Sequence, residues 1–199
     1  MGHLYDQVRQ EGYSVALRQA WDDLEAVSKE RSFKVAILDG TASLDLGSRE
    51  IEFDLTEKGR FMEIVVLHYL AWAVVHESRL PRWDWALFRQ MPGGEAYQAA
   101  FQQRVIAPLA DAFSSAPRTL VHAAEQLGGR SEAFGSATVD VPFLPLLPVR
   151  VTVWQGDEEV PGNATMLFPK TLPPMLPTED YAVVGEVVLA ALKRVSSVQ

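Results

Sequence analysis

Apolar side chains recur at helical spacing near the start of the chain and again in its middle. Between residues 4 and 30 one face of a helix is predicted, because apolar residues recur every three or four positions: Leu17, Ala20, Trp21, Leu24 and Val27. Gly12 is expected to divide this region. The stretch from Arg60 to Glu77 is apolar almost all round, which predicts a central, buried helix.

Three further helices are predicted in the second half of the chain. Residues 97–113 read as a helix with an irregularity at Pro108, and residues 118–127 as another that Gly128 and Gly129 stop. A closing helix begins at Thr178, a good N-cap, with acidic residues in its first turn and basic residues in its last. Its buried stripe consists of Val183, Val184, Val187, Val188, Ala191 and Leu192.

Strand patterns fall into two batches. Residues 33–38, 42–46 and 51–55 predict a three-stranded antiparallel meander, since Ile51, Phe53 and Leu55 alternate with acidic residues. The later strands are expected at residues 83–88, 137–141, 149–154 and 164–168. Because helices separate the batches without regular strand–helix alternation, we predict an α+β fold with a central buried helix and a C-terminal helix.

Proline is concentrated late in the chain: 8 of the 12 prolines lie between Pro142 and Pro177. Proline has no N–H to donate to a sheet, so the strands among these residues are expected at sheet edges or beside extended segments. The run from Pro142 to Pro148 should be extended, and its apolar side chains indicate that it packs on the body of the protein.

Composition narrows the function classes. The chain has 199 residues, of which 48% are hydrophobic, and a formal charge of −8. Zero cysteine excludes disulfides, thiol nucleophiles and thiolate metal sites of its own. An acidic chain without a basic cluster is not expected to bind nucleic acid or anionic membranes. The first residues lack a signal-peptide pattern, so we expect a cytoplasmic protein, and the length favours a single domain over residues 1–199.

One histidine and four tryptophans are candidates for a cofactor pocket. His68 lies between Leu67 and Tyr69 in the apolar helix, where it should be buried or line a cavity. Aromatic walls are common in cofactor pockets, although ordinary core packing explains the same residues. The tryptophans are Trp72, Trp83, Trp85 and Trp154.

The densest acidic cluster is Asp157, Glu158 and Glu159. Carboxylates bind hard cations and serve as general acids and bases, so this cluster is a candidate metal site. A solvated hairpin turn explains it as well. Sequence motifs for a serine nucleophile or a P-loop are absent. Arg79, Arg82 and Arg89 could each contact a carboxylate or phosphate with two N–H groups.

Several motifs together resemble a bacterial family, the domain-of-unknown-function 3786 family. They span nearly the whole chain: Leu67–Leu70, Trp85–Gly94, Tyr97, Phe101, Pro108–Ala110, Pro145–Pro148, Trp154–Glu159, Met166–Phe168 and Leu176–Asp180. Val160 departs from the pattern, which usually has phenylalanine there. The cysteine-rich iron–sulfur segment that often accompanies the domain is also missing.

The resemblance implies a cytoplasmic protein close to corrinoid, iron–sulfur and one-carbon metabolism in anaerobes, without an assigned activity. We therefore expect an accessory protein that binds a small organic cofactor, a tetrapyrrole or corrinoid, and works beside an iron–sulfur or corrinoid protein. Two alternatives remain open. One is an enzyme that uses the acidic cluster with a divalent metal, and the other is an interaction module that docks a redox partner through Pro142–Pro148.

Overall fold

The chain folds into two antiparallel sheets and a set of helices. The computed structural model describes residues 2–56, 58–59, 61–76, 84–171 and 174–197, with side chains from Gln10 onward. The elements are α1 (Gly2–Val27), β1 (Ser32–Ile37), β2 (Gly40–Asp45), β3 (Glu50–Asp54), α2 (Met62–His76), β4 (Asp84–Leu87), the 3₁₀ turn η1 (Phe88–Gln90), α3 (Gly94–Phe101), the π-helical turn η2 (Gln102–Ile106), α4 (Ala107–Phe113), α5 (Pro117–Gln126), β5 (Arg130–Glu132), β6 (Ala137–Leu144), β7 (Leu147–Trp154), β8 (Asn163–Lys170) and α6 (Thr178–Ser196).

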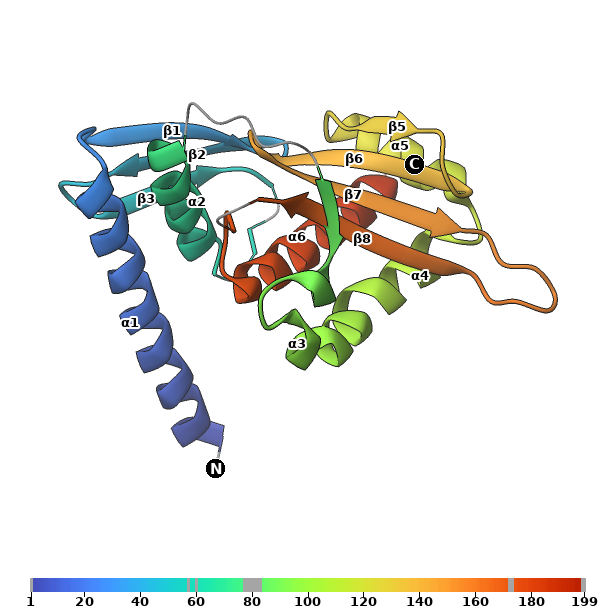
Figure 1. Ribbon diagram of the computed structural model, residues 1–199, viewed down its shortest axis with the longest axis horizontal. Coiled ribbons are helices and arrows are strands. Elements are labelled where there is room, and N and C mark those ends of the chain that lie inside the picture. The colour runs from blue at the N-terminus through green and yellow to red at the C-terminus, as the bar shows by residue number, and fades with distance from the viewer. Residues whose placement is uncertain (1, 57, 60, 77–83, 172–173, 198–199) are drawn as a thin grey trace.

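The two sheets confirm the predicted α+β class. Strands β1, β2 and β3 form the expected antiparallel meander, and the larger sheet has the order β4-β8-β7-β6-β5 (Figure 1). A backbone hydrogen bond joins the two sheets: the Leu38 N–H donates to the Phe143 carbonyl at 2.9 Å. An irregularity in β6 between Pro142 and Leu144 takes Phe143 out of register, which leaves its carbonyl available to β1.

The proline-containing strands are internal, which corrects the expectation of edge strands. β6, β7 and β8 each lie between two neighbours, and β4 and β5 form the edges. Each proline nevertheless lies where its strand has one partner only. Pro142 pairs with Pro148 beyond the ends of the β5 and β8 ladders, and Pro169 pairs with Trp85 beyond the end of the β7 ladder. On the other side of each proline no strand is paired, so a missing N–H group on that side interrupts no ladder.

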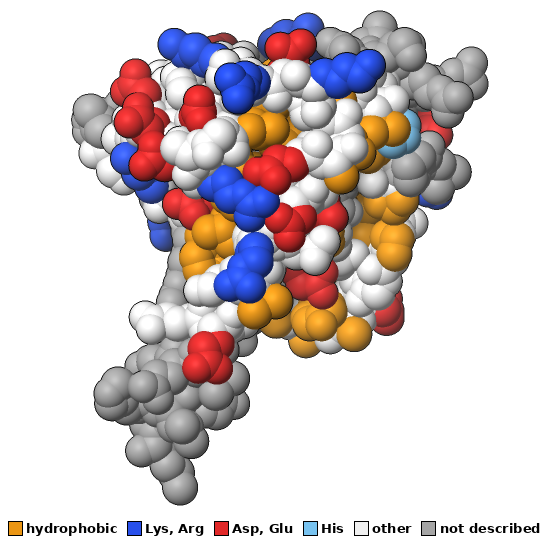
Figure 2. Space-filling view, turned by 90° about the vertical axis from the view of Figure 1, so that its left-hand side faces the viewer, with side chains coloured by type: hydrophobic (Ala, Val, Ile, Leu, Met, Phe, Trp, Pro, Cys, Tyr) orange, Lys and Arg blue, Asp and Glu red, His pale blue; other side chains and the backbone are white. Residues whose placement is uncertain are grey.

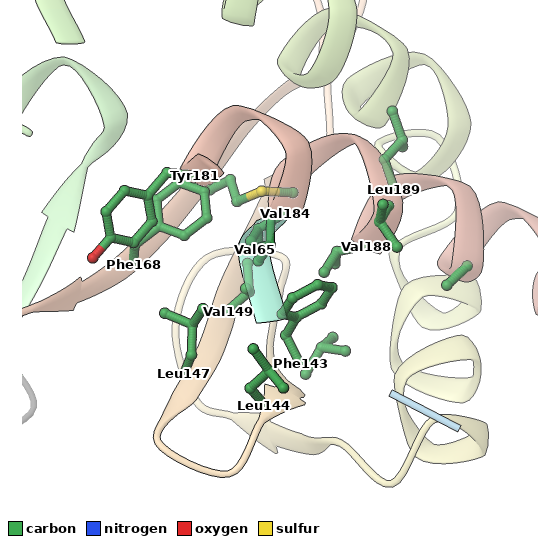
Figure 3. Close-up of a cluster of buried hydrophobic side chains, with 14 of the residues drawn as sticks. Val65, Phe143, Leu144, Leu147, Val149, Phe168, Tyr181, Val184, Val188 and Leu189 are labelled. Carbon is green, nitrogen blue, oxygen red and sulfur yellow. The ribbon is translucent and has the colours of Figure 1, made fainter. Parts of the chain in front are cut away.

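Helices cover one face of the larger sheet and enclose the core with it. In Figure 3 the side chains of Phe143 and Leu147, from the β6–β7 hairpin, lie close to Val65 of α2 and Val184 of α6. Phe143 and Leu147 are fully buried, and burial of one such side chain contributes about 2 kcal/mol. The run from Pro142 to Pro148 thus packs on the body as predicted, but as a hairpin. Its buried side chains are not available for docking a redox partner.

Four predictions about helix boundaries and irregularities have different outcomes. Gly12 does not divide the first helix, because α1 is continuous through it; a glycine in an exposed helix costs only about 1 kcal/mol. Thr178 is not the N-cap of α6; that position is held by Pro177. The irregularity expected at Pro108 is present as the π-helical turn η2. Gly128, with φ of 74°, confirms the predicted helix stop after α5.

The surface of the described residues carries mixed charge. In Figure 2, which shows the face on the left-hand side of Figure 1, acidic and basic side chains alternate with separate hydrophobic patches. The described residues of that face therefore form no continuous basic surface. No helix in the described ranges is both long and apolar enough to cross a membrane.

Candidate functional site

His68 lies in the middle of α2, in a helix whose other side chains are mostly apolar. Its neighbours Leu67 and Tyr69 are buried, whereas the His68 side chain keeps 23% of its surface exposed. Packing of α2 against α1 and α6 holds the helix in place on two sides. The imidazole is therefore held on a packed helix and is still partly exposed.

Asp180 is the partner of this histidine. Its Oδ2 lies 2.6 Å from His68 Nδ1, although the two residues are 112 positions apart in the chain. Asp180 sits in the first turn of α6 and is only 7% exposed. Ionised carboxylates only accept hydrogen bonds, so Nδ1 is the donor. In the neutral imidazole this leaves the lone pair on Nε2.

A pocket of about 420 Å³ opens beside the pair and is lined by His68, Ala71, Asp23, Pro92 and residues 174–179. Asp180 is not among the lining residues. Because Asp180 engages Nδ1, Nε2 is the ring nitrogen that remains for a ligand. This volume falls in the range usual for small-molecule sites.

Tyr181 and Thr178 hold the rim of this pocket. Backbone N–H groups of Met175 and Leu176 bond to the Tyr181 hydroxyl, and burial raises the pKa of Tyr181 to about 12. The Thr178 hydroxyl donates to the Pro92 carbonyl, in the turn before α3. The hydroxyl that was expected to cap α6 is thus used to fasten the start of α6 to a distant turn.

The charge of the lining is acidic. Asp23 and Glu179 both line the pocket, and none of its described lining residues is a lysine or arginine. A ligand with positive or no charge is therefore favoured over an anion. Chemically, a histidine whose Nδ1–H is held by a carboxylate suits two tasks: ligation of a metal through Nε2 and acceptance of a proton.

The chain matches one family model, described as Domain of unknown function (DUF3786), over residues 17–191. It belongs to the DUF3786 family. His68 and Asp180 of this DUF3786 protein both lie inside the matched region. No curated protein and no solved structure gives a significant match.

Of the described tryptophans named as pocket residues, Trp72 is the one that lies near His68. It follows one turn later on α2, where residues four apart share a face. Its ring stacks on His76 at 4.7 Å between centroids, and the His76 Nδ1 lies 2.8 Å from the Trp72 carbonyl oxygen. Trp83 lies outside the described residues.

Trp85 and Trp154 of the DUF3786 protein lie on the far side of the larger sheet. Phe168, opposite Ala86, packs on Tyr181 of α6 at 5.1 Å, so the adjacent Trp85 points to the other face. There the Arg150 guanidinium lies 4.4 Å from the Trp85 ring. Trp154 pairs with Asn163 and Trp85 with Pro169, a separation of about 20 Å along β8. The structure does not bring these two rings to His68.

The acidic cluster of the family motif forms the turn between β7 and β8. Asp157, Glu158 and Glu159 are all exposed. The Asp157 carboxylate accepts the N–H groups of Glu159 and Val160 at 2.9 and 2.8 Å, and these bonds lower its pKa. Among the described residues, no three His, Cys, Asp or Glu side chains gather as a metal site. The three carboxylates of this turn are thus not gathered as a set of metal ligands in the described structure.

Sequence reasoning missed the functional meaning of Asp180. It was noted only as an acidic residue near a helix start. Its spacing of three, four and seven from Val183, Val184 and Val187 places it on the buried stripe of the helix. A carboxylate buried at such a position requires a partner. This requirement is the sequence signal from which a pairing of Asp180 could have been inferred.

Proposed function

We propose that this DUF3786 protein is an accessory cofactor-binding protein whose ligand sits against Nε2 of His68. The ligand class is an organic cofactor with a metal centre, a corrinoid or another tetrapyrrole. The observation that carries the proposal is the His68–Asp180 pair, 2.6 Å apart, of which His68 lines the pocket and Asp180 does not. Ligating histidines commonly donate their other ring N–H to a carboxylate in this manner.

The acidic lining favours a corrinoid over a haem. Asp23 and Glu179 would repel the carboxylate side chains of haem, whereas a corrinoid with amide side chains and a cationic metal centre suits the same surface. The open pocket accommodates one face of a large ring. When bound, such a cofactor would supply methyl-transfer or electron-transfer chemistry; the chain would hold it through His68 and orient that imidazole through Asp180.

The setting follows from the same proposal. We place the protein in the cytoplasm, in anaerobic one-carbon or iron–sulfur metabolism, beside an iron–sulfur or corrinoid protein. The absence of cysteine from the chain supports the need for a partner, since the chain cannot ligate an iron–sulfur cluster through its own thiolates.

An absorbance titration tests the proposal. Aquocobinamide, which lacks a nucleotide base of its own, and haemin are each titrated into the wild-type protein, into His68→Ala and into Asp180→Asn. The matched control is His122→Ala, because His122 is exposed on α5, where it pairs with Glu125 at 3.6 Å.

The wild type and His122→Ala should shift the cobinamide spectrum as imidazole ligation does, and His68→Ala should not. Asp180→Asn should weaken binding about 10- to 100-fold, the usual cost of losing the group that orients a ligating histidine. Haemin should bind more weakly than cobinamide. An unchanged cobinamide spectrum in the wild type, or an equal shift with His68→Ala, would overturn the proposal.

A further inference from the structure

A second pocket lies beside η1, and it differs from the first in charge. It has a volume of about 240 Å³ and is lined by residues from β4, η1, α3, η2 and β8. Its polar lining consists of Arg89, Gln98, Gln102, Asn163 and Thr165. None of its described lining residues is acidic, so its one formal charge is positive.

Arg89 supplies that charge. It lies in η1, is exposed, and has no ion-pair partner among the residues that the structure describes. The position of η1 is fixed by close packing: a Cβ on Gly94 would lie 2.1 Å from the Phe88 carbonyl oxygen. A guanidinium on a fixed turn is suited to two parallel hydrogen bonds with a carboxylate.

Gln98 supplies an unfilled hydrogen-bonding group. Its Oε1 is buried and has no hydrogen-bond partner, which is rare for a buried polar atom. The terminal torsion of glutamine is broad, so a rotation of the amide presents this acceptor to the pocket. A bound molecule with an N–H or O–H group would then donate the hydrogen bond that Gln98 Oε1 lacks.

The backbone beside the pocket is also unusual. The Ala107 N–H bonds to the Gln102 carbonyl, five residues back, in the π-helical turn η2. Pro108 next to it has no N–H for the regular helical bond, which accounts for the widened turn. Such turns occur frequently at functional sites, and this one carries Gln102 and Ile106 of the pocket wall.

We propose that this pocket binds a small carboxylate that also carries an N–H or O–H donor, with the carboxylate on Arg89 and the donor on Gln98. Phe88 and Phe101, whose rings stack at 4.2 Å, form its apolar wall. The volume is below the range for drug-sized ligands and limits the occupant to the size of an amino acid or a short amide acid. This site is separate from the pocket at His68 and does not depend on the proposed function.

Three related probes test the two contacts. Succinamate has a carboxylate and an amide, succinamide has no carboxylate, and monomethyl succinate has no N–H donor. Each is titrated to high millimolar concentration while the side-chain amide signals of ¹⁵N-labelled protein are followed by NMR. The variants are Arg89→Lys and Gln98→Leu, and the matched control is Arg118→Lys, at an exposed arginine on α5.

Succinamate should bind at least about tenfold more tightly than either analogue, the effect of one hydrogen bond to a charged or buried group. Arg89→Lys should weaken succinamate by a similar factor, Gln98→Leu should remove its advantage over monomethyl succinate, and Arg118→Lys should change neither. Absence of binding by all three probes, equal binding of all three, or succinamate binding unaffected by Arg89→Lys would each overturn the proposal.

Discussion

The His68–Asp180 pair should be measurably coupled in the free energy of unfolding, without any ligand. The Nδ1–Oδ2 distance is 2.6 Å, Asp180 is 7% exposed and the His68 side chain is 23% exposed. A hydrogen bond to a charged group contributes about 1.5–3 kcal/mol. Because His68 is partly in water, we expect a coupling near the middle of that range, about 2 kcal/mol.

The two single substitutions should lower the free energy of unfolding by different amounts. His68→Ala leaves a buried carboxylate without its partner and should cost about 3 kcal/mol. Asp180→Ala removes the same bond and also a favourable charge in the first turn of α6, which is worth about 0.3–1 kcal/mol. That helix contribution does not involve His68, so a double-mutant cycle removes it.

Urea unfolding followed by circular dichroism gives the four free energies, with a common dependence on denaturant. The control cycle uses Arg104 and Glu186, an exposed pair 3.8 Å apart, whose coupling should be below about 0.5 kcal/mol. If His68→Ala and Asp180→Ala prove additive to within about 0.5 kcal/mol, Asp180 does not hold the imidazole and the reasoning about the site fails.

Three other predictions test the fold around the two pockets and at the β6–β7 hairpin. Burial raises the pKa of Tyr181 to about 12, so the folded state favours the neutral phenol. The free energy of unfolding should therefore fall as pH rises from about 10 to 12. Urea unfolding at a series of pH values should show this loss reduced by about 2–3 kcal/mol in Tyr181→Phe. Gly94→Ala would place a Cβ 2.1 Å from the Phe88 carbonyl oxygen, and thermal unfolding should show a loss of about 2 kcal/mol or more. Leu147→Ala, at a fully buried position, should lower the free energy of unfolding by about 3 kcal/mol. Pro145→Ala, at an exposed position in the same hairpin, should change it by less than about 0.5 kcal/mol. Equal effects of the two substitutions would contradict the placement of the hairpin.

Local patterns predicted most of the fold. The alternation around Ile51 and Phe53 and the apolar run of α2 depend only on neighbouring residues, and the structure confirms both elements. The internal place of the proline-containing strands could not be predicted in the same way. It depends on where the neighbouring ladders end, at pairs such as Arg150 and Leu167. The local sequence of one strand does not reveal how many residues of the next strand pair with it. Thr178 likewise binds a carbonyl 86 positions away, which local capping rules do not consider.

The candidate site was predictable only in part, for the same reason. His68 stood out because a titratable group in an apolar helix needs an explanation within the helix itself. Its partner Asp180 comes from the other end of the chain. Only its position on the buried stripe of α6 indicated that Asp180 is buried. Trp85 and Trp154 could not be placed from the sequence, because aromatic content does not reveal on which face of a sheet a ring lies. Trp85 and His68 are separated by the larger sheet, although they are near each other in the sequence.

Electron paramagnetic resonance of Co(II) cobinamide bound to the protein tests the central proposal most directly, because the axial ligand splits the cobalt signal according to its nuclear spin. With the wild-type protein, the account predicts a three-line splitting from one ¹⁴N ligand, which becomes a two-line splitting when the histidines carry ¹⁵N. The splitting should persist in His122→Ala and disappear in His68→Ala. A spectrum without nitrogen splitting in the wild type, or one that His68→Ala leaves unchanged, would contradict the assignment of His68 as the ligand.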